Sequence, residues 1–97
     1  MSYYSHKVTG GKLIKVKVDS KDESILDITI LGDFFLHPEH VLEEIEVSLI
    51  GVRLSEDTIT ERLISVLEKN HAKLIGASAR DFANAIMAAW MASDHNS

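Results

Sequence analysis

The segment Ile25–Phe35 constrains the fold more than any other part of the sequence. It alternates apolar and polar side chains and then reaches the Gly32–Phe35 corner, a glycine followed by an acid and two aromatic rings. Alternation with a period of two is typical of a half-buried strand, so Leu26, Ile28 and Ile30 are predicted to share the buried face. The glycine ends the strand because it lets the backbone turn where a β-carbon would clash.

Two further strands are predicted before this segment. Tyr3–Val8 is a short candidate strand, and Lys12–Val18 alternates between apolar and polar residues. The buried face of this second strand is predicted to consist of Ile14, Val16 and Val18. Thr9–Gly11 is typical of a turn, and the polar run Asp19–Ser24 of a hairpin loop. The strands are predicted to form a three-stranded antiparallel meander with one apolar face, which needs a cover.

Three C-terminal helices are predicted to supply that cover. Pro38 suits the first turn of the first helix, because its missing N–H would be unpaired there, and Gly51 suits the helix end. The second helix is predicted over about Ser55–Asn70, with an N-cap at its first residue. Ala72–Ile75 is assigned to a loop or to one more helical turn. The sequence therefore indicates the α+β class, with the strands first and the helices after them.

The third helix begins with a capping-box pattern and ends near the C-terminus. Ser78 and Asp81 have the spacing at which each side chain bonds the backbone of the other. The helix is predicted to fray from Met91. At 97 residues the chain makes one domain, residues 1–97, with flexible ends expected at residues 1–4 and 93–97.

The composition excludes several classes of protein. The absence of cysteine excludes disulfides, thiol nucleophiles and cysteine metal sites. A net charge of −5 argues against a general nucleic-acid binder, which has a basic surface. No apolar run approaches the roughly 20 residues that span a bilayer, and the N-terminus has no apolar signal core. We therefore expect a cytoplasmic protein that binds neither nucleic acid nor membrane.

The charges are unevenly distributed along the chain. Residues 22–57 carry ten acids and one base, Arg53, whereas five of the ten basic residues lie within the first 21 positions. These five are Lys7, Lys12, Lys15, Lys17 and Lys21. One interpretation is the solvated polar face of a hairpin. The alternative is a basic strand face that meets an acidic partner or a phosphate.

No complete catalytic or metal site is evident in the sequence. Of the five histidines only His37 and His40 are close, and no third ligand accompanies them. The acids of Glu43–Glu46 are most simply the solvent-facing side of a helix. Gly10–Lys12 resembles a fragment of a phosphate-binding loop but lacks the full spacing. Whether the chain is itself an enzyme therefore stays open.

The two adjacent rings of the Gly32–Phe35 corner have no place in a simple alternating strand. In an extended chain Phe34 and Phe35 cannot both point inward, so one ring is expected in the core and the other on the surface as a partner contact. Asp33 is expected to cap the turn or the helix start. The alternative is that both rings lie beneath the helices.

Four segments of the sequence together resemble the C-terminal accessory domain of lipoate–protein ligases. They are Val8–Val16, the strand that ends in the Gly32–Phe35 corner, Leu42–Gly51 and Asp81–Ile86. The resemblance spans Ser5 to Trp90, and the Gly-Asp-Phe-Phe corner is its most specific motif. It implies a fold similar to iron–sulfur scaffold and sulfur-acceptor proteins. Those proteins act through cysteine, which is absent here, so only their fold is expected.

The resemblance also implies a function as a separate, non-catalytic subunit, because the sequence starts at its own methionine with no large domain before it. A large catalytic subunit of lipoate–protein ligase would require this chain, in a heterodimer, to activate lipoate with ATP to lipoyl-AMP. The lipoyl group then passes to a lysine of an acyl-carrier domain, the lipoyl acceptor. ATP, Mg²⁺ and lipoate are expected in the complex, and no cofactor is expected on this chain alone.

The expected functional residues lie on the basic strand and at the corner. The candidates for partner binding are Lys12, Lys15, Lys17, Gly32, Asp33, Phe34 and Phe35. The charge asymmetry also makes Lys7 and Lys12 candidates for contact with a phosphate. No catalytic or metal-binding residue is expected. Two other interpretations stay open, namely an interaction module or homodimer unrelated to lipoylation, and a small-molecule-binding domain that acts alone.

Overall fold

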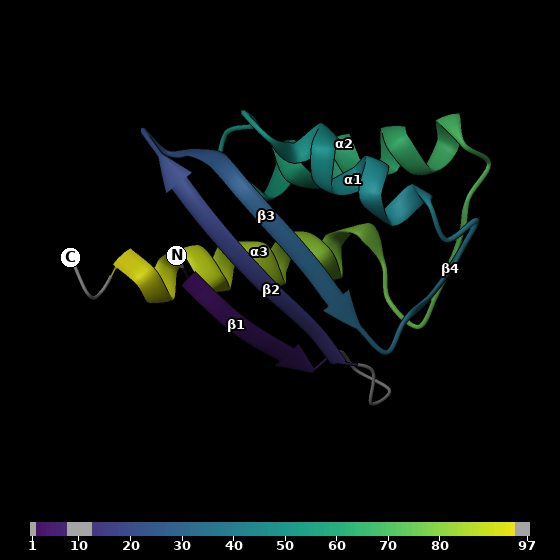
Figure 1. Ribbon diagram of the computed structural model, residues 1–97, viewed down its shortest axis with the longest axis horizontal. Helices are drawn as coiled ribbons and strands as arrows, with labels where there is room; N and C mark the ends of the chain where they lie inside the picture. Colours follow the sequence, from purple (N-terminus) through teal and green to yellow (C-terminus); the bar gives the residue numbers. More distant parts are fainter. Residues whose placement is uncertain (1, 8–12, 95–97) are drawn as a thin grey trace.

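The protein combines small antiparallel sheets with three helices, in agreement with the predicted mixture of strands and helices (Figure 1). The computed structural model describes residues 2–7 and 13–94, and of residues 2–7, 93 and 94 the backbone only. The strands are β1 (Ser2–Lys7), β2 (Leu13–Lys21), β3 (Ser24–Gly32), β4 (Phe35–His37) and β5 (Lys73–Ile75). The helices are α1 (Val41–Leu49), α2 (Glu56–Lys69) and α3 (Ala79–Asp94). None of these helices is long and apolar enough to cross a membrane.

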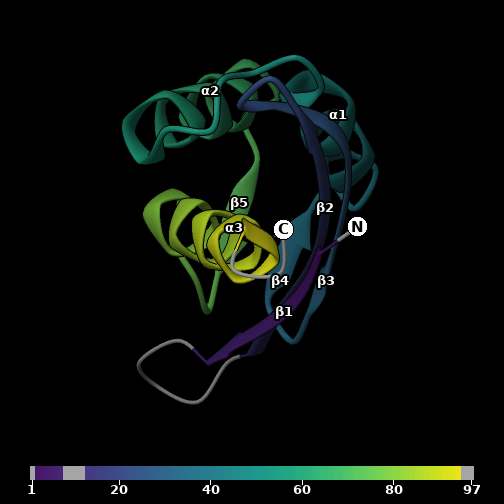
Figure 2. The same ribbon diagram turned by 90° about the vertical axis from the view of Figure 1, so that its left-hand side faces the viewer.

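The larger sheet has the strand order β1-β2-β3, and each neighbouring pair is antiparallel. Ile14, Val16 and Val18 of β2 are fully buried, which confirms the predicted apolar face. The sheet curves around α3, which packs against β1 and β2 (Figure 2). The buried residues that α3 contributes are Phe82, Ala83, Ala85, Ile86 and Ala89. The predicted turn at Thr9–Gly11 lies outside the described residues.

The predicted six-residue loop between β2 and β3 is wrong, because the hairpin is much tighter. The strands continue until Lys21 pairs with Ser24, and only Asp22 and Glu23 connect them. Both residues have positive φ, 54° and 64°. Two successive residues with positive φ give a turn whose twist matches that of the flanking strands, so the ladder can run to its end.

The predicted alternation in β3 is also wrong at its first residues. Leu26 was expected inside, but its side chain is 50% exposed, whereas Ile25 is buried. The cause is a register shift in the hairpin, where Asp19 pairs with Asp27 but the next residue of β2 pairs with Ile25. Leu26 is therefore an extra residue of β3, and such a bulge moves the residues beyond it to the other face. Ile28 and Ile30 lie in the core as predicted.

A second, two-stranded sheet was not predicted. Its strands β4 and β5 pair antiparallel, so the chain that follows the Gly32–Phe35 corner meets a segment that follows α2. The assignment of Ala72–Ile75 to a loop or to one more helical turn is therefore wrong, because residues 73–75 are β5. His71, with φ 50°, ends the helical path and turns the chain into this strand.

The first helix begins later than predicted. Pro38 does not lie in its first turn, because α1 starts at Val41 with His40 in the N-cap position. The Val41 N–H donates to the Pro38 carbonyl over 3.1 Å, so a separate turn precedes the helix. The predicted end is confirmed, since Gly51 follows the C-cap residue with a φ of 86°.

The predicted start of α3 is confirmed at the level of hydrogen bonds. The Ser78 N–H donates to the Asp81 carboxylate over 2.8 Å, and the Asp81 N–H donates to the Ser78 hydroxyl over 3.1 Å. This reciprocal pair satisfies two donors that the helix backbone leaves unpaired. The helix continues to Asp94, beyond the predicted fraying at Met91. The ends expected to be flexible include residues 1 and 95–97, which lie outside the described residues.

Three N–H groups on the outer edge of β3 have acceptors within the chain. The Ile25 N–H donates to the Val52 carbonyl over 2.9 Å, and the Ile28 N–H to the carboxylate of the preceding Asp27 over 3.0 Å. The Ile30 N–H donates to the Glu46 carboxylate of α1 over 2.7 Å. These bonds tie the start of β3 to the chain that follows α1, and its end to α1 itself.

Candidate partner-binding surface

The Gly32–Phe35 corner is fixed by a close approach between two backbone segments. The Asp33 N–H donates to the Leu13 carbonyl over 2.9 Å, which holds the end of β3 against the start of β2. A β-carbon on Gly32 would lie 2.3 Å from that carbonyl oxygen and 3.0 Å from the Phe34 ring. Only glycine fits here without a backbone shift, which is the steric reason predicted for it.

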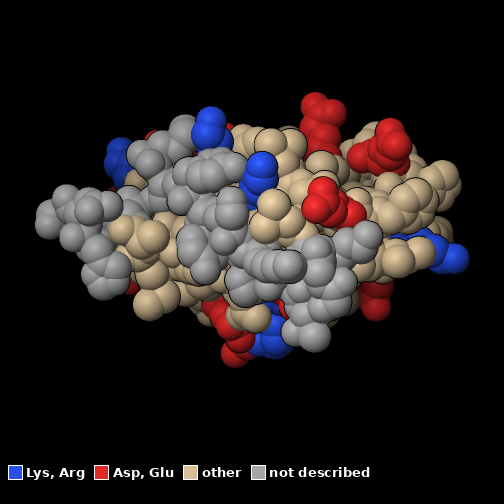
Figure 3. Space-filling view, turned by 90° about the horizontal axis from the view of Figure 1, so that it is seen from below, with Lys and Arg blue, Asp and Glu red and all other residues tan. Residues whose placement is uncertain are grey.

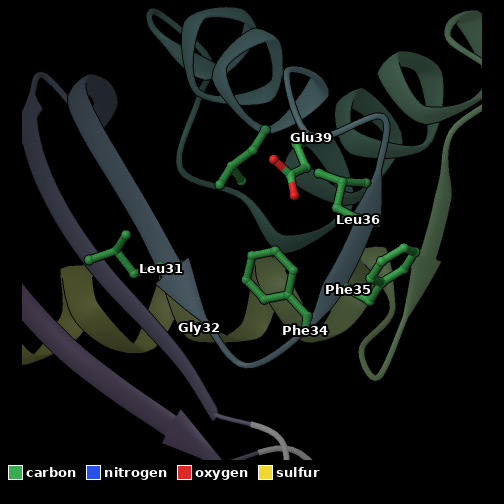
Figure 4. A pocket seen from close by; sticks show the side chains of 7 residues that line it. Leu31, Gly32, Phe34, Phe35, Leu36 and Glu39 are labelled. Carbon is green, nitrogen blue, oxygen red and sulfur yellow. The ribbon is translucent and has the colours of Figure 1, made fainter.

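The two rings of the corner have different environments, as predicted. Phe34 is half-buried and meets Phe82 of α3 edge to face, with 4.9 Å between the ring centroids and 80° between the planes. Phe35 is 53% exposed, and its ring is parallel to that of His37 with 6.3 Å between the centroids. Figure 4 shows the two rings on opposite sides of the β4 backbone. Phe35 is thus the ring available to a partner.

A hollow of about 410 Å³ opens beside the corner. Its lining consists of Leu31, Gly32, Phe34, Phe35, Leu36, Glu39 and Leu42. In Figure 4 the Glu39 carboxylate points into the space that Phe34 and Leu36 border. The hollow is therefore an apolar surface with a single acid among its described lining residues, and Leu31 and Phe35 are both more than half exposed.

Ile75 extends this apolar surface, and the sequence analysis missed it. The register of the small sheet places Ile75 directly opposite Phe35, and each side chain is 53% exposed. Paired residues of an antiparallel ladder have neighbouring side chains on one face. No signal in the sequence locates this pair, because a three-residue strand has no measurable periodicity and its partner strand is far away in the chain.

The predicted lysines lie beside the corner where the structure describes them. Lys17 is exposed and Lys15 half-exposed, on the face of β2 opposite to its buried residues. Lys15 pairs with Leu31, which also lines the hollow, so the basic strand face and the corner form one continuous surface. Lys12 lies outside the described residues, and Lys7 is described only by its backbone, which pairs with Leu13. A phosphate contact by either lysine stays a prediction.

The described charges do not gather into a single patch on the face shown in Figure 3, where basic and acidic side chains are scattered. Arg80 of α3 forms ion pairs with Glu56 and Asp57 of α2. The hydrogen bond that the Arg80 guanidinium donates to the Glu56 carboxylate raises the pKa of Arg80. This arginine borders a second hollow, about 510 Å³ in volume, but its charge is already matched within the chain.

The described residues contain no group of three histidine, aspartate or glutamate side chains that could hold a metal ion. His37, one of the two closely spaced histidines, is exposed and stacks on Phe35. The described surface near the corner instead combines exposed apolar side chains with charges at their margin, which is the usual organisation of a protein–protein interface.

Comparisons with known proteins agree with one another. The sequence model of the bacterial lipoate protein ligase C-terminus matches residues 2–86. Among solved structures, the chain is similar to one from an archaeal lipoylation system of Thermoplasma acidophilum, which comprises a bipartite lipoate protein ligase and its E2 lipoyl domain. The two share 28% identity with a TM-score of 0.74, over 88% of this chain and 93% of that chain. No curated protein sequence matches.

Proposed function

Because this chain belongs to the bacterial lipoate protein ligase C-terminus family, we propose that it is the accessory subunit of a two-chain lipoate–protein ligase. The observation that carries the proposal is the likeness to a chain of a bipartite lipoate protein ligase system, which the alignment covers over 93% of its length. The expected similarity to iron–sulfur scaffold folds stays a prediction and carries no weight here.

In this proposal the catalytic subunit binds lipoate, ATP and Mg²⁺ and forms lipoyl-AMP before lipoyl transfer to a lysine of the acceptor domain. In this proposal the accessory chain contributes no reacting atom. Its role is to order the catalytic subunit. Formation of an acyl adenylate needs reactants held in line and water kept away, and a small domain that docks over the site can supply both.

The docking surface in this proposal is the corner together with the basic strand face. Phe35, Ile75 and Leu31 supply apolar area that is exposed in the free chain. Lys15 and Lys17 border it with positive charge. Apolar side chains surrounded by charges match the usual organisation of a protein–protein interface.

The test is formation of lipoyl-AMP by a catalytic lipoate–protein ligase chain from the same genome, with and without this protein. We expect adenylation only when both chains are present, and a heterodimer in sedimentation velocity. Lys12→Ala then tests the phosphate contact, which predicts slower adenylation even when the variant is present at a concentration that saturates the catalytic chain. A catalytic chain that is fully active alone, or that does not associate with this protein, would contradict the proposal.

A further inference from the structure

Glu39 is the one charged residue among the described residues that line the hollow beside the corner. All the other lining residues are apolar or glycine. Among the described parts of the chain Glu39 forms no ion pair. Its carboxylate points into the hollow rather than away from it (Figure 4). Free water solvates this group in the isolated protein, because the residue is exposed.

The position of Glu39 next to α1 offers a simpler explanation, which is stabilisation of the helix dipole. The Leu42 N–H donates to the Glu39 carbonyl, so the acid adjoins the helix N-terminus. However, Glu43 and Glu44 already place two acids in the first turn. The side chain of Glu43 is exposed and does not line the hollow. Stabilisation of the dipole of α1 therefore does not require the carboxylate of Glu39.

We infer that the hollow receives an apolar side chain of the catalytic subunit, and that a lysine or arginine next to that side chain pairs with Glu39. This inference rests on the proposed function and specifies the chemistry of its docking contact. A partner that covered the hollow would remove water from the carboxylate, and a desolvated carboxylate is costly unless a cation meets it. A basic neighbour makes the apolar contact compatible with Glu39, because it supplies an opposite charge and hydrogen-bond donors together.

The size and charge of the surroundings fit this occupant. The hollow, about 410 Å³ in volume, exceeds the ~30 Å³ share of one water molecule more than tenfold, so a whole side chain can enter. Glu39 lines the hollow, and Lys15 lies on the other side of Leu31. A cation of the partner is therefore favoured on the Glu39 side of the hollow and disfavoured on the Lys15 side.

The experiment compares two single-charge variants that differ in access to the hollow. Glu39→Gln removes the acid that lines it, and Glu43→Gln removes an acid from the same end of α1. Affinity for the catalytic chain is measured by titration calorimetry at about 50 and 300 mM NaCl, where screening differs strongly. We expect Glu39→Gln to weaken binding about tenfold at low salt and to flatten the salt dependence. Glu43→Gln should leave both nearly unchanged.

A charge swap identifies the cation on the partner. Glu39→Lys should weaken binding more than Glu39→Gln does. One lysine or arginine of the catalytic chain, changed to glutamate, should restore the affinity of Glu39→Lys while weakening that of the wild type. Such reciprocal rescue measures a pairwise contact, because effects on helix stability cannot depend on the partner's sequence.

The outcomes separate this inference from the proposed function. If the wild-type chains associate but Glu39→Gln binds as tightly as wild type, or no more weakly than Glu43→Gln, the inference is wrong and the proposed function stands. If the wild-type chains do not associate, the proposed function fails and the inference fails with it. Thermal unfolding of each variant alone tests whether a loss of affinity results from a loss of folded protein.

Discussion

The two sheets of this protein use apolar side chains in opposite ways. The core face of the larger sheet is fully buried against the helices, at Ile14, Val16 and Val18 of β2 and Ile30 of β3. Among its described residues the exposed apolar side chains, Leu26 and Leu31, belong to β3. In the two-stranded sheet only Leu36 is buried. Phe35 and Ile75 form a cross-strand pair in which each side chain is 53% exposed. The larger sheet therefore holds the fold together, and the smaller sheet presents apolar surface.

This difference shows that burial, and not hydrophobicity, separates the apolar side chains of the core from those that a partner could contact. The larger sheet contains isoleucine, leucine and valine, and the smaller sheet contains isoleucine, leucine and phenylalanine. The two sheets therefore contain similarly hydrophobic residues. An exposed apolar pair adds little to folding, and clustered apolar exposure marks a site of interaction. The corner joins the two sheets, because the half-buried Phe34 packs against Phe82 of α3 while the next residue, Phe35, faces solvent.

The largest effect is expected in the larger sheet. Ile30→Ala deletes a fully buried side chain at the centre of the core. We expect it to lower the free energy of unfolding by about 2–5 kcal/mol, since the lost contacts leave a cavity. Urea denaturation followed by circular dichroism measures this change. A loss below about 1 kcal/mol would mean that the sheet is less tightly packed than described.

The corresponding change in the smaller sheet should affect binding and not folding. Phe35→Ala is expected to change the free energy of unfolding by less than about 1 kcal/mol, because the ring is half exposed. It should weaken association with the catalytic subunit about 30-fold, or roughly 2 kcal/mol. Met91→Ala, at a position 54% exposed on α3, is the control that should alter neither quantity. If Phe35→Ala and Met91→Ala had equal effects on affinity, the exposed ring of the smaller sheet would not be a partner contact.

The corner between the sheets should tolerate no side chain at Gly32. Gly32→Ala places a β-carbon 2.3 Å from the Leu13 carbonyl oxygen, and no side-chain movement can relieve a backbone contact. We expect a loss of about 1–3 kcal/mol in unfolding free energy together with weaker association, because the corner must shift. Gly51→Asn is the control, since nothing lies within 4 Å there and asparagine tolerates its positive φ of 86°. A Gly32→Ala protein as stable as the wild type would show that the backbone at Gly32 can move away from the Leu13 carbonyl at little cost.

The smallest effect concerns the frame of the smaller sheet and depends on pH. The Asn70 amide, just before β5, donates to the Glu44 carboxylate of α1 over 3.0 Å and lowers the pKa of Glu44 below its ordinary value of 4.5. A carboxyl whose pKa is lower in the folded state stabilises that state above the unfolded pKa, and the stabilisation disappears as the pH falls through the folded pKa.

Glu44→Gln should therefore reduce the rise in stability on going from acid to neutral pH. The two stability profiles should separate as the pH rises through the range below about 4.5, and the variant should be the less stable protein above it. Thermal melts of the wild type and the variant, at a series of pH values, measure this difference. The variant Glu43→Gln, which removes an exposed acid one residue away, serves as the control. Parallel pH profiles for Glu44→Gln and the wild type would contradict the assignment.

The elements that the sequence predicted well are those with a long pattern or a specific cap. The alternation of β2 is confirmed at Ile14, Val16 and Val18, and the capping box of Ser78 and Asp81 is present in its hydrogen bonds. Both signals are local, because a strand face and a helix start are set by residues within a few positions. The steric need for Gly32 was also predictable from its place after a strand.

The elements that the sequence did not predict depend on contacts between distant segments. The bulge that exposes Leu26 arises from the register between two strands, which no single strand encodes. The pairing of Phe35 with Ile75 joins residues that are far apart in sequence, in strands too short for a periodic signal. The start of α1 at Val41 follows from a turn closed by the Pro38 carbonyl. The predicted partner surface did not include Ile75, which pairs with Phe35, or Leu31 and Glu39, which line the hollow.

The Glu46 carboxylate accepts a hydrogen bond from Ile30 on the outer edge of β3, and this contact affects how two copies of the chain can associate. Strand edges with free N–H groups recruit strands from other molecules and lead to aggregation. Here the N–H groups of Ile25, Ile28 and Ile30 already have acceptors within the chain. A second copy of the chain finds these three donors already occupied, so strand pairing with the edge of β3 is blocked at these positions.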